Sequence, residues 1–336
     1  MTQATPLIWA LLGKRTGDNN QVLALAEELG LPFVSKFLNY GRVGGYDLGR
    51  IKPKRLGATI LSLDSSSRAE IRPPWPDLVI GAGKRNVPVA RFIRKMSGGQ
   101  TKLVRIGNPR VDPGLFDLVI TTPQYEVPVA ENVLKLPVAM SRFQGPAELE
   151  ADARQWLDAQ QRPHLLLALG GNTKDVELPT DVVAAAASKL AARASSQGGS
   201  LLIIGSPRTG PELLRSAMPH GVPVPDDGPS FAALLDDADE IFVTADSVSM
   251  LSEAIITGKP VGMIPARLTE SGLKAVGEMP RGLFDSRSPM RDPRNFWANL
   301  EQNALVGTVD SPRSSGTENT VARAARAVRQ LLGDAG

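Results

Sequence analysis

The feature that most constrains this chain is an alternation of short apolar runs with amphipathic stretches, repeated from one end to the other. Apolar runs predict buried strands, and the alternation is typical of βαβ units that build a parallel sheet. In the first half the expected strands are residues 6–12, 77–83, 102–106 and 117–121, and the expected helices are 20–30 and 87–96. Residues 13–20, 40–58 and 64–76, rich in turn-forming and basic residues, are expected to be turns and loops.

The same pattern restarts after a linker at residues 141–150. The expected strands of this second half are 164–171, 200–206, 240–245 and 260–265, and the expected helices are 179–197, 247–257 and 320–332. Because 336 residues exceed the usual size of one hydrophobic core, we expect two domains. The predicted boundaries are an N-terminal domain at 1–145, a C-terminal domain at 146–318 and a terminal helix within 319–336. Whether that helix returns to the N-terminal domain is left open.

Composition excludes several classes of site. The absence of cysteine excludes disulfides, thiolate metal sites and thiol catalysis. The two histidines, His164 and His220, are too few for a multi-histidine metal centre. No apolar run approaches the roughly 20 residues of a membrane helix, and no signal peptide is expected at the N-terminus. These features predict a cytoplasmic protein.

Charge is divided unequally between the two halves. Residues 1–145 hold 20 Lys and Arg against 11 Asp and Glu, a net of +9, whereas residues 146–336 hold 18 against 24, a net of −6. A basic half is expected to face an anionic partner. The low aromatic content of 5% argues against nucleic acid, so an anionic membrane surface on the inner face fits better. A plain basic surface that aids solubility is the alternative.

The segment 240–265 carries the sharpest signal for a ligand. An apolar strand ends in Thr244, Asp246 and Ser247, and a helix follows it directly. The start of such a helix presents free amides and a partial positive charge, which suit a diphosphate. Helical spacing places Val248, Leu251, Ser252 and Ile255 against the sheet, and Asp246, Ser249, Met250 and Glu253 on the outward face. Asp246 and Ser247 as simple helix caps, with a solvated Glu253, are the structural alternative.

Two other turns are expected at the same edge of the sheet. Gly170, Gly171 and Asn172 follow one strand, and glycine there allows backbone amides to approach a phosphate. The next strand is followed by three candidate anion donors, Ser206, Arg208 and Thr209. Since ligands bind outside the carboxyl ends of the strands of an open parallel sheet, the three turns predict one site.

The N-terminal domain offers turns at the corresponding positions. Its candidate acceptor-side residues are Lys14, Arg15, Lys84 and Arg85. Asp18 is a candidate general base, provided that the opposing domain closes over it, and an ordinary helix N-cap is the alternative. The first turn is no P-loop because it lacks the GK[ST] sequence. Asp237-Ala238-Asp239 has the Asp-x-Asp pattern of metal-dependent transferases, but it lies at the opposite sheet edge and is expected to be a solvated connection. No metal site is predicted.

Four segments carry a resemblance to a known family: TADSVSMLSEAIITGKPV (244–261), GKRTGDNNQVLALAEELGL (13–31), PDLVIGAGKRNVPVARFIRK (76–95) and GSPRTG (205–210). Through them most of the chain resembles the bacterial members of the mitochondrial-fission, or "elongated mitochondria", family. The whole is also similar to GT-B glycosyltransferases. The resemblance implies an α/β fold of two Rossmann-like domains facing a central cleft.

The resemblance also implies roles for individual residues. Ser247, Ser249 and Met250 would contact the donor phosphate or base, and Glu253 the ribose. Arg208 would meet the diphosphate, and Asp18 would take the position of the base. This chain departs from the family where a histidine of the first turn is replaced by Asp18, and where the arginine pair of the GSPRTG-type turn is reduced to Arg208.

The sequence therefore predicts a glycosyltransferase that uses a nucleotide-diphosphate sugar as substrate, with no metal or other cofactor. The basic domain would present a lipid or lipopolysaccharide-type acceptor through residues such as Arg42, Arg50, Lys52, Lys54 and Arg55. One alternative is an inactive scaffold of the same fold that acts through protein or membrane partners, and another is a sugar-nucleotide epimerase. The nucleotide, the sugar, the acceptor, the stereochemistry and the oligomeric state stay open.

Overall fold

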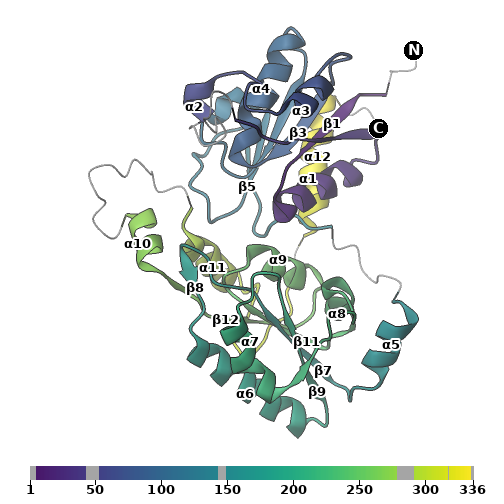
Figure 1. Cartoon of the computed structure of the whole chain (residues 1–336), viewed down its shortest axis with the longest axis vertical. Coiled ribbons are helices and arrows are strands. Elements are labelled where there is room, and N and C mark those ends of the chain that lie inside the picture. Colours follow the sequence, from purple (N-terminus) through teal and green to yellow (C-terminus); the bar gives the residue numbers. More distant parts are fainter. Residues whose placement is uncertain (1–4, 43–52, 143–148, 278–290, 317, 334–336) are drawn as a thin grey trace. The chain divides into compact units, whose positions relative to one another are not determined.

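The computed structural model describes residues 5–42, 53–142, 149–277, 291–316 and 318–333. The chain divides into two compact units, unit 1 with Met1–Arg142 and Asn319–Gly336, and unit 2 with Phe143–Glu318 (Figure 1). The last helix, α12 (Thr320–Leu332), belongs to unit 1 and packs on its first helix, α1 (Thr16–Glu28). The Arg329 guanidinium donates to the backbone oxygen of Glu28 at 2.6 Å. The chain therefore leaves unit 1 and returns to it.

Unit 1 is built on a six-stranded parallel sheet with the order β2-β1-β3-β4-β5-β6. Successive residues of β1 alternate between two apolar layers: Ile8 packs with α1 and α12, and Trp9 packs with α4 on the other face. The strands are Ile8–Leu12, Phe33–Phe37, Leu78–Ala82, Lys102–Ile106, Leu118–Thr121 and Val133–Lys135. The remaining helices are α2 (Pro53–Leu56), α3 (Ser65–Glu70) and α4 (Val87–Met96), with short 3-10 turns at Lys84–Asn86 (η2) and Pro113–Leu115 (η3).

Unit 2 repeats this design with a five-stranded parallel sheet in the order β10-β9-β7-β11-β12. These strands are β7 (His164–Leu169), β9 (Ser200–Gly205), β10 (Val222–Pro223), β11 (Glu240–Thr244) and β12 (Val261–Ile264). A small antiparallel pair joins β8 (Val176–Glu177) to β13 (Arg267–Leu268). The helices are α5 (Ala151–Asp158), α6 (Thr180–Ser196), α7 (Pro211–Ala217), α8 (Phe231–Asp237), α9 (Val248–Ile256), α10 (Glu270–Val276) and α11 (Pro293–Gln302), with the 3-10 turn η4 at Met218–His220.

Each sheet contains one place where the direction of strand addition reverses. In unit 1 the chain adds β2 on one side of β1 and then β3 on the other. In unit 2 it adds β9 and β10 on one side of β7 and then β11 on the other. At such a switch point the loops after neighbouring strands part in opposite directions, which opens a crevice at the carboxyl ends. These two edges are where a ligand is expected.

The predicted α/β fold is confirmed, and several elements match their predicted ranges, among them β4, α4 and α12. The prediction of a turn over 13–20 is wrong in its second part, because α1 begins at Thr16. The Asn19 side-chain amide bonds both the N–H and the C=O of Gly13, at 2.8 and 2.7 Å, so the turn closes within a few residues. The predicted loops 40–58 and 64–76 contain α2 and α3, and the half-exposed edge strand β2 was not predicted.

Candidate functional site

The turn after β11 buries the polar side chains that the sequence singled out. Thr244 is fully buried and Asp246 is 6% exposed. The Thr244 hydroxyl donates to Asp246 Oδ1 at 2.8 Å and accepts from the Gly170 N–H at 2.7 Å. The prediction that Asp246 faces outward is therefore wrong. Helical spacing does not apply to this residue, because α9 begins only at Val248.

The turn after β7 meets the same carboxylate. The Gly171 N–H donates to Asp246 Oδ2 at 2.9 Å. A Cβ added to Gly170 would lie 2.2 Å from Asp246 Oδ1, and one added to Gly171 would lie 2.0 Å from the backbone oxygen of Arg208. Both glycines are thus required by close packing. Their amides already serve the Thr244 and Asp246 side chains, so a phosphate would have to find other donors than the two amides that the sequence favoured.

Arg208, from the turn after β9, completes the contact across the switch point. Its Nη2 lies 3.4 Å from Asp246 Oδ2, while 48% of its side chain is exposed. Burial raises the pKa of the Asp246 carboxyl, and the Gly171 amide, the Thr244 hydroxyl and the Arg208 charge oppose that rise. The buried carboxylate therefore holds one edge of a guanidinium whose remainder faces solvent.

The other two candidate donors of this turn have structural partners. The Thr209 hydroxyl donates to the backbone oxygens of Leu169 and Gly170 and accepts from the Ser206 N–H at 2.7 Å. The Ser206 hydroxyl lies 3.1 Å from that of Thr209 and accepts from the Arg208 amide at 3.3 Å. These bonds fasten the turn after β9 to the end of β7, and so they fix where Arg208 stands.

Helix α9 presents its first turn at this edge. Ser247 is the N-cap residue, and its side chain makes no capping bond. Among the described residues, none accepts a hydrogen bond from the backbone N–H of Val248, Ser249 or Met250. Ser249 is exposed, and Met250 and Glu253 are half-buried. Open amides with a partial positive charge at a helix start favour the binding of an anion.

Asn172 shapes the loop that follows β7 through its side-chain oxygen. Its Oδ1 accepts from the Leu178 N–H at 2.7 Å, six residues further along the chain. The loop is tied again where the Thr269 hydroxyl donates to the backbone oxygen of Lys174 at 2.7 Å. The carboxyl end of β7 is therefore a fixed surface.

Trp297 is a residue of this edge that sequence reasoning missed. It lies on α11, which was not predicted, and its Nε1–H donates to the backbone oxygen of Ala245 at 2.7 Å. The indole is half-buried beside the turn that leads into α9. An amphipathic pattern around Phe296 and Leu300, both fully buried, is the signal that could have revealed this helix.

Asp18 lies at the switch point of unit 1. It is the third residue of α1, whose N-cap is Arg15, so the alternative that Asp18 caps the helix is wrong. Its carboxylate lies against the turn after β3, because a Cβ added to Gly83 would be 2.9 Å from Asp18 Oδ2. Gly83 has a φ of 77°, a conformation that glycine adopts readily. The first and third strands thus bring their turns together at Asp18.

The predicted acceptor-side residues occupy these same two turns. Lys14 and Arg15 are exposed after β1, and Lys84 and Arg85 are half-buried in η2 after β3. The Arg85 guanidinium carbon lies 5.3 Å from the centre of the Tyr40 ring. Of the more distant basic residues predicted to meet an acceptor, Arg42 is exposed, whereas Arg50, Lys52 and the side chains of Lys54 and Arg55 lie outside the described residues.

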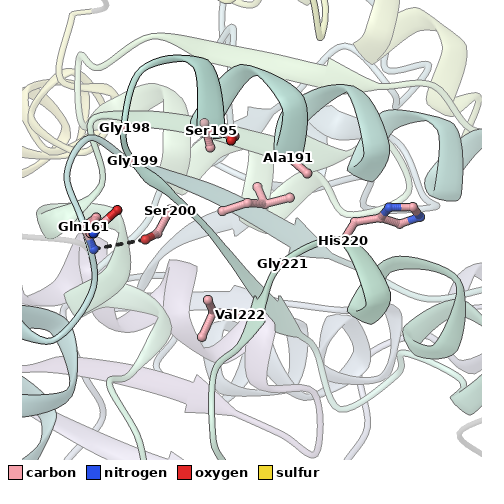
Figure 2. Close-up of a pocket in the computed structure, with 11 residues that line it drawn as sticks. Gln161, Ala191, Ser195, Gly198, Gly199, Ser200, His220, Gly221 and Val222 are labelled. Carbon is pink, nitrogen blue, oxygen red and sulfur yellow. Dashed lines mark hydrogen bonds between the residues drawn. The ribbon is translucent and has the colours of Figure 1, made fainter.

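The amino edge of the unit 2 sheet has a different character. A hollow of about 270 Å³ lies there. Small and polar residues line it, among them Ser195, Ser200 and His220 (Figure 2). The Gln161 N–H donates to the Oγ of Ser200, another lining residue, at 3.0 Å. Because Ser200 and Val222 begin their strands, this hollow lies at the opposite edge from the three turns.

Asp237 also lies at this amino edge, at the start of the connection from α8 to β11 that the sequence predicted. The Asp239 side chain there is 44% exposed, but the prediction that Asp237 is solvated is wrong. Its carboxylate bonds His164 Nδ1 at 2.5 Å and forms an ion pair with Arg162. The Asp237 side chain is 14% exposed, and although burial opposes it, the bonds from His164 and the charge of Arg162 lower its pKa. The group is a structural network that anchors the start of β7.

Within the part of the chain that the structure describes, no group of three or more His, Asp or Glu side chains is placed to hold a metal ion. No helix within the same residues is both long and apolar enough to cross a membrane.

The sequence of this chain is similar to a known protein family and to a curated relative. The model of the family described as mitochondrial fission ELM1 matches residues 16–277, which include Asp18 in α1 and the turns after β3, β7, β9 and β11. A curated relative, an uncharacterized protein of Rickettsia prowazekii (strain Madrid E), is 24% identical over 302 residues, covering 76% of this chain and 82% of the relative.

Solved structures share the fold over both units. The S. aureus MnaA–UDP co-structure matches with a TM-score of 0.51 and 11% identity, covering 97% of each chain. A putative UDP-N-acetylglucosamine 2-epimerase from Listeria monocytogenes matches with a TM-score of 0.51 and 12% identity, covering 99% of this chain and 98% of the other. The fold is therefore of the GT-B type, with two Rossmann-like units.

Proposed function

We propose a function from one premise, that this chain belongs to the mitochondrial fission ELM1 family. Unit 2 binds the diphosphate of a nucleotide sugar, and the protein transfers the sugar to a lipid or glycolipid acceptor at a membrane surface. The observation that carries this proposal is the convergence of Gly171, Asp246 and Arg208 across the switch point between β7 and β11. A crevice of this kind is where α/β folds bind nucleotides.

The donor site would hold a diphosphate with two kinds of positive group. The backbone amides of Val248, Ser249 and Met250 supply hydrogen bonds and the partial charge of the helix end. The exposed part of the Arg208 guanidinium supplies a full charge from the neighbouring turn. Glu253, one turn along α9, would accept hydrogen bonds from the ribose hydroxyls. The fold shared with a UDP-bound protein supports a nucleotide at this edge.

The reaction would need no bound metal. As the bond from sugar to diphosphate breaks, negative charge grows on the leaving phosphate, where preorganised amides and a guanidinium stabilise it. Asp18 would remove the proton of the acceptor hydroxyl as general base. The net charge of +9 over residues 1–145 would draw an acceptor that lies in an anionic membrane, with Lys14, Arg15, Lys84 and Arg85 near the base.

Isothermal titration with UDP, GDP, CMP and TDP tests the donor site. We expect at least one of them to bind below millimolar concentration, and Arg208→Ala to weaken that affinity about 10- to 100-fold, since a charge-assisted hydrogen bond contributes about 1.5–3 kcal/mol. Lys189→Ala is the matched control, because Lys189 pairs with Asp310 on the surface. Absence of binding by all four nucleotides at millimolar concentration would reject the site.

Product analysis separates transfer from its rivals. Purified protein is incubated with a radiolabelled sugar nucleotide, with and without a membrane lipid extract. Label that moves into the lipid fraction supports the transferase, and an epimerised sugar nucleotide without any acceptor supports the epimerase. The scaffold is supported if the protein binds the nucleotide but neither transfers nor epimerises the sugar. In that case the Asp18→Asn variant should keep its function in cells.

A further inference from the structure

Arg105 is a buried cation in the middle of the unit 1 sheet. It lies on β4, which pairs with β3 and β5, and it is 3% exposed. Its guanidinium donates to three neutral oxygens, Gly83 O at 3.0 Å, Asn86 Oδ1 at 2.9 Å and Asn108 O at 3.2 Å. Its Nε–H has no hydrogen-bond partner among the described residues. Burial of an incompletely satisfied guanidinium is unfavourable, so a plain core residue would be expected in this strand.

The three bonds of Arg105 join two turns at the carboxyl edge. Gly83 and Asn86 belong to the turn after β3, and Asn108 belongs to the turn after β4. Each turn is also fixed by itself: the Asn86 side chain donates to the backbone oxygen of Ala82, and the Asn108 side chain accepts from the amide two residues later. Arg105 therefore sets the relative position of two turns that are rigid individually.

One of these turns supports Asp18. Gly83 accepts from Arg105 through its backbone oxygen and lies against the Asp18 carboxylate on its Cα side, where a Cβ would come within 2.9 Å of Oδ2. Although burial lowers the pKa of Arg105 to about 10, the guanidinium stays charged at neutral pH, and the attraction of Asp18 is the largest effect opposing that fall. A buried positive charge thus stands behind the carboxylate, with Gly83 between them.

We propose that Arg105 is a positioning residue for Asp18, because it fixes Gly83 beneath the carboxylate and provides a buried positive charge behind it. This role rests on the proposed function, in which Asp18 is the general base. Arg105 itself touches no reacting atom. A side chain that merely filled the core would fasten neither turn and would leave the orientation of Asp18 free.

A double-mutant cycle in turnover is the first test. The variants are Arg105→Met, Asp18→Asn and the double variant, with Arg72→Met, an exposed arginine, as control. Because residues that act as one unit are non-additive, we expect Arg105→Met to lower kcat about 30-fold in the native background and less than about 2-fold beside Asp18→Asn. The KM for the donor, which binds in unit 2, should stay unchanged. Equal losses in both backgrounds would overturn the positioning role.

Arg105→Lys distinguishes the charge from the shape of the side chain and guards against a variant that does not fold. Lysine keeps the charge but cannot make all three bonds in the same geometry. It should therefore recover part of the loss that methionine causes, about 3- to 10-fold in kcat. No recovery in a folded lysine variant would show that the charge behind Asp18 does not matter.

The same cycle measured by urea denaturation needs no activity. If Arg105 and Asp18 are coupled, the fall in unfolding midpoint of the double variant differs from the combined falls of the single variants. Additive falls would overturn the coupling. Failure of the proposed function would be seen differently, as the absence of nucleotide binding by the native protein. The unfolding cycle does not depend on nucleotide binding, so it can still be interpreted in that case.

Discussion

The two switch points carry opposite arrangements of charge. In unit 1 a buried arginine, Arg105, stands behind the more exposed carboxylate of Asp18. In unit 2 a buried carboxylate, Asp246, stands behind the half-exposed guanidinium of Arg208. A glycine lies at the contact in each case, Gly83 in the first and Gly171 in the second.

This contrast teaches how one fold is adapted to two tasks. A buried charge attracts and orients an exposed group of opposite sign, so the sign of the buried residue decides what the edge presents to a ligand. The edge of unit 2 presents a cation, which suits a diphosphate. The edge of unit 1 presents a carboxylate, which suits proton abstraction from a hydroxyl. This difference is why we propose the donor site in unit 2 and the general base in unit 1.

The largest expected effect is at the glycine of unit 2. Gly171→Ala would place a Cβ 2.0 Å from the backbone oxygen of Arg208 and 2.4 Å from its carbonyl carbon. Because backbone cannot rotate away as a side chain does, we expect a loss of about 3 kcal/mol in the free energy of unfolding. Urea denaturation measures it. Gly210→Ala, in the turn after β9 that also holds Arg208, is the control, since its Cβ would meet nothing within 4 Å and its φ is −70°. A Gly171 variant as stable as this control would contradict the packing.

The glycine of unit 1 should be less sensitive. A Cβ on Gly83 would meet a side chain, Asp18 Oδ2, and the φ of 77° adds a left-handed strain of about 1–2 kcal/mol for alanine. Asp18 can shift to accommodate it, so the same denaturation experiment should show a smaller loss than for Gly171. Since the shift displaces the proposed base, Gly83→Ala should also reduce kcat. Expressed as a free energy of activation, that loss should exceed the loss in the free energy of unfolding. A larger loss of stability than at Gly171 would break the comparison.

Much of this arrangement could be predicted from sequence because it depends on topology. The alternating pattern gave the parallel sheets, and parallel sheets bring the turns at Gly170, Ser206 and Asp246 to one edge whatever their side chains do. The direction of each side chain depends on long-range partners. Asp246 turns inward because Thr244 and Gly171 bond it, and Gly171 lies 75 residues away. No local periodicity contains that information.

Two residues show the limits of pattern reasoning in another way. Trp297 reaches Ala245 from a helix 52 residues further along the chain, so only the folded chain reveals the contact. Arg105 was visible as a charge inside the apolar strand KLVRI, and a charged residue in a strand with both faces buried is a signal of its own. Its partners, Gly83 and Asn86, lie on the neighbouring turn and become apparent only in the structure.

The two buried charged residues, Asp246 and Arg105, should affect the pH dependence of stability differently. Burial raises the pKa of Asp246, so the folded state takes up a proton at a higher pH than the unfolded chain. Stability therefore falls as pH rises from the ordinary titration range of aspartate through the raised pKa, and is level above it. Arg105, with a pKa of about 10, is charged in both states throughout that range and adds no slope.

Asp246→Asn tests this assignment. The variant cannot ionise, so the difference in unfolding free energy between native protein and variant should change from the ordinary titration range of aspartate through the raised pKa of Asp246 and be constant above it. Urea denaturation at a series of pH values measures the difference. Asp310→Asn, an exposed carboxylate paired with Lys189, is the control. A difference that does not vary with pH would mean that Asp246 is not a titrating buried group.

The smallest expected effect is at Trp297. Trp297→Phe keeps an aromatic ring but removes the hydrogen bond from Nε1 to the backbone oxygen of Ala245, worth about 1 kcal/mol. Because Ala245 immediately precedes Asp246, loosening this turn should weaken nucleotide binding about 2- to 5-fold, a fraction of the effect of Arg208→Ala. Trp156→Phe on α5 is the matched control in the same unit. If both tryptophan variants bind nucleotide equally, the hydrogen bond from Trp297 does not help to position the turn before α9, and the bonds of Thr244 and Asp246 are enough to hold it.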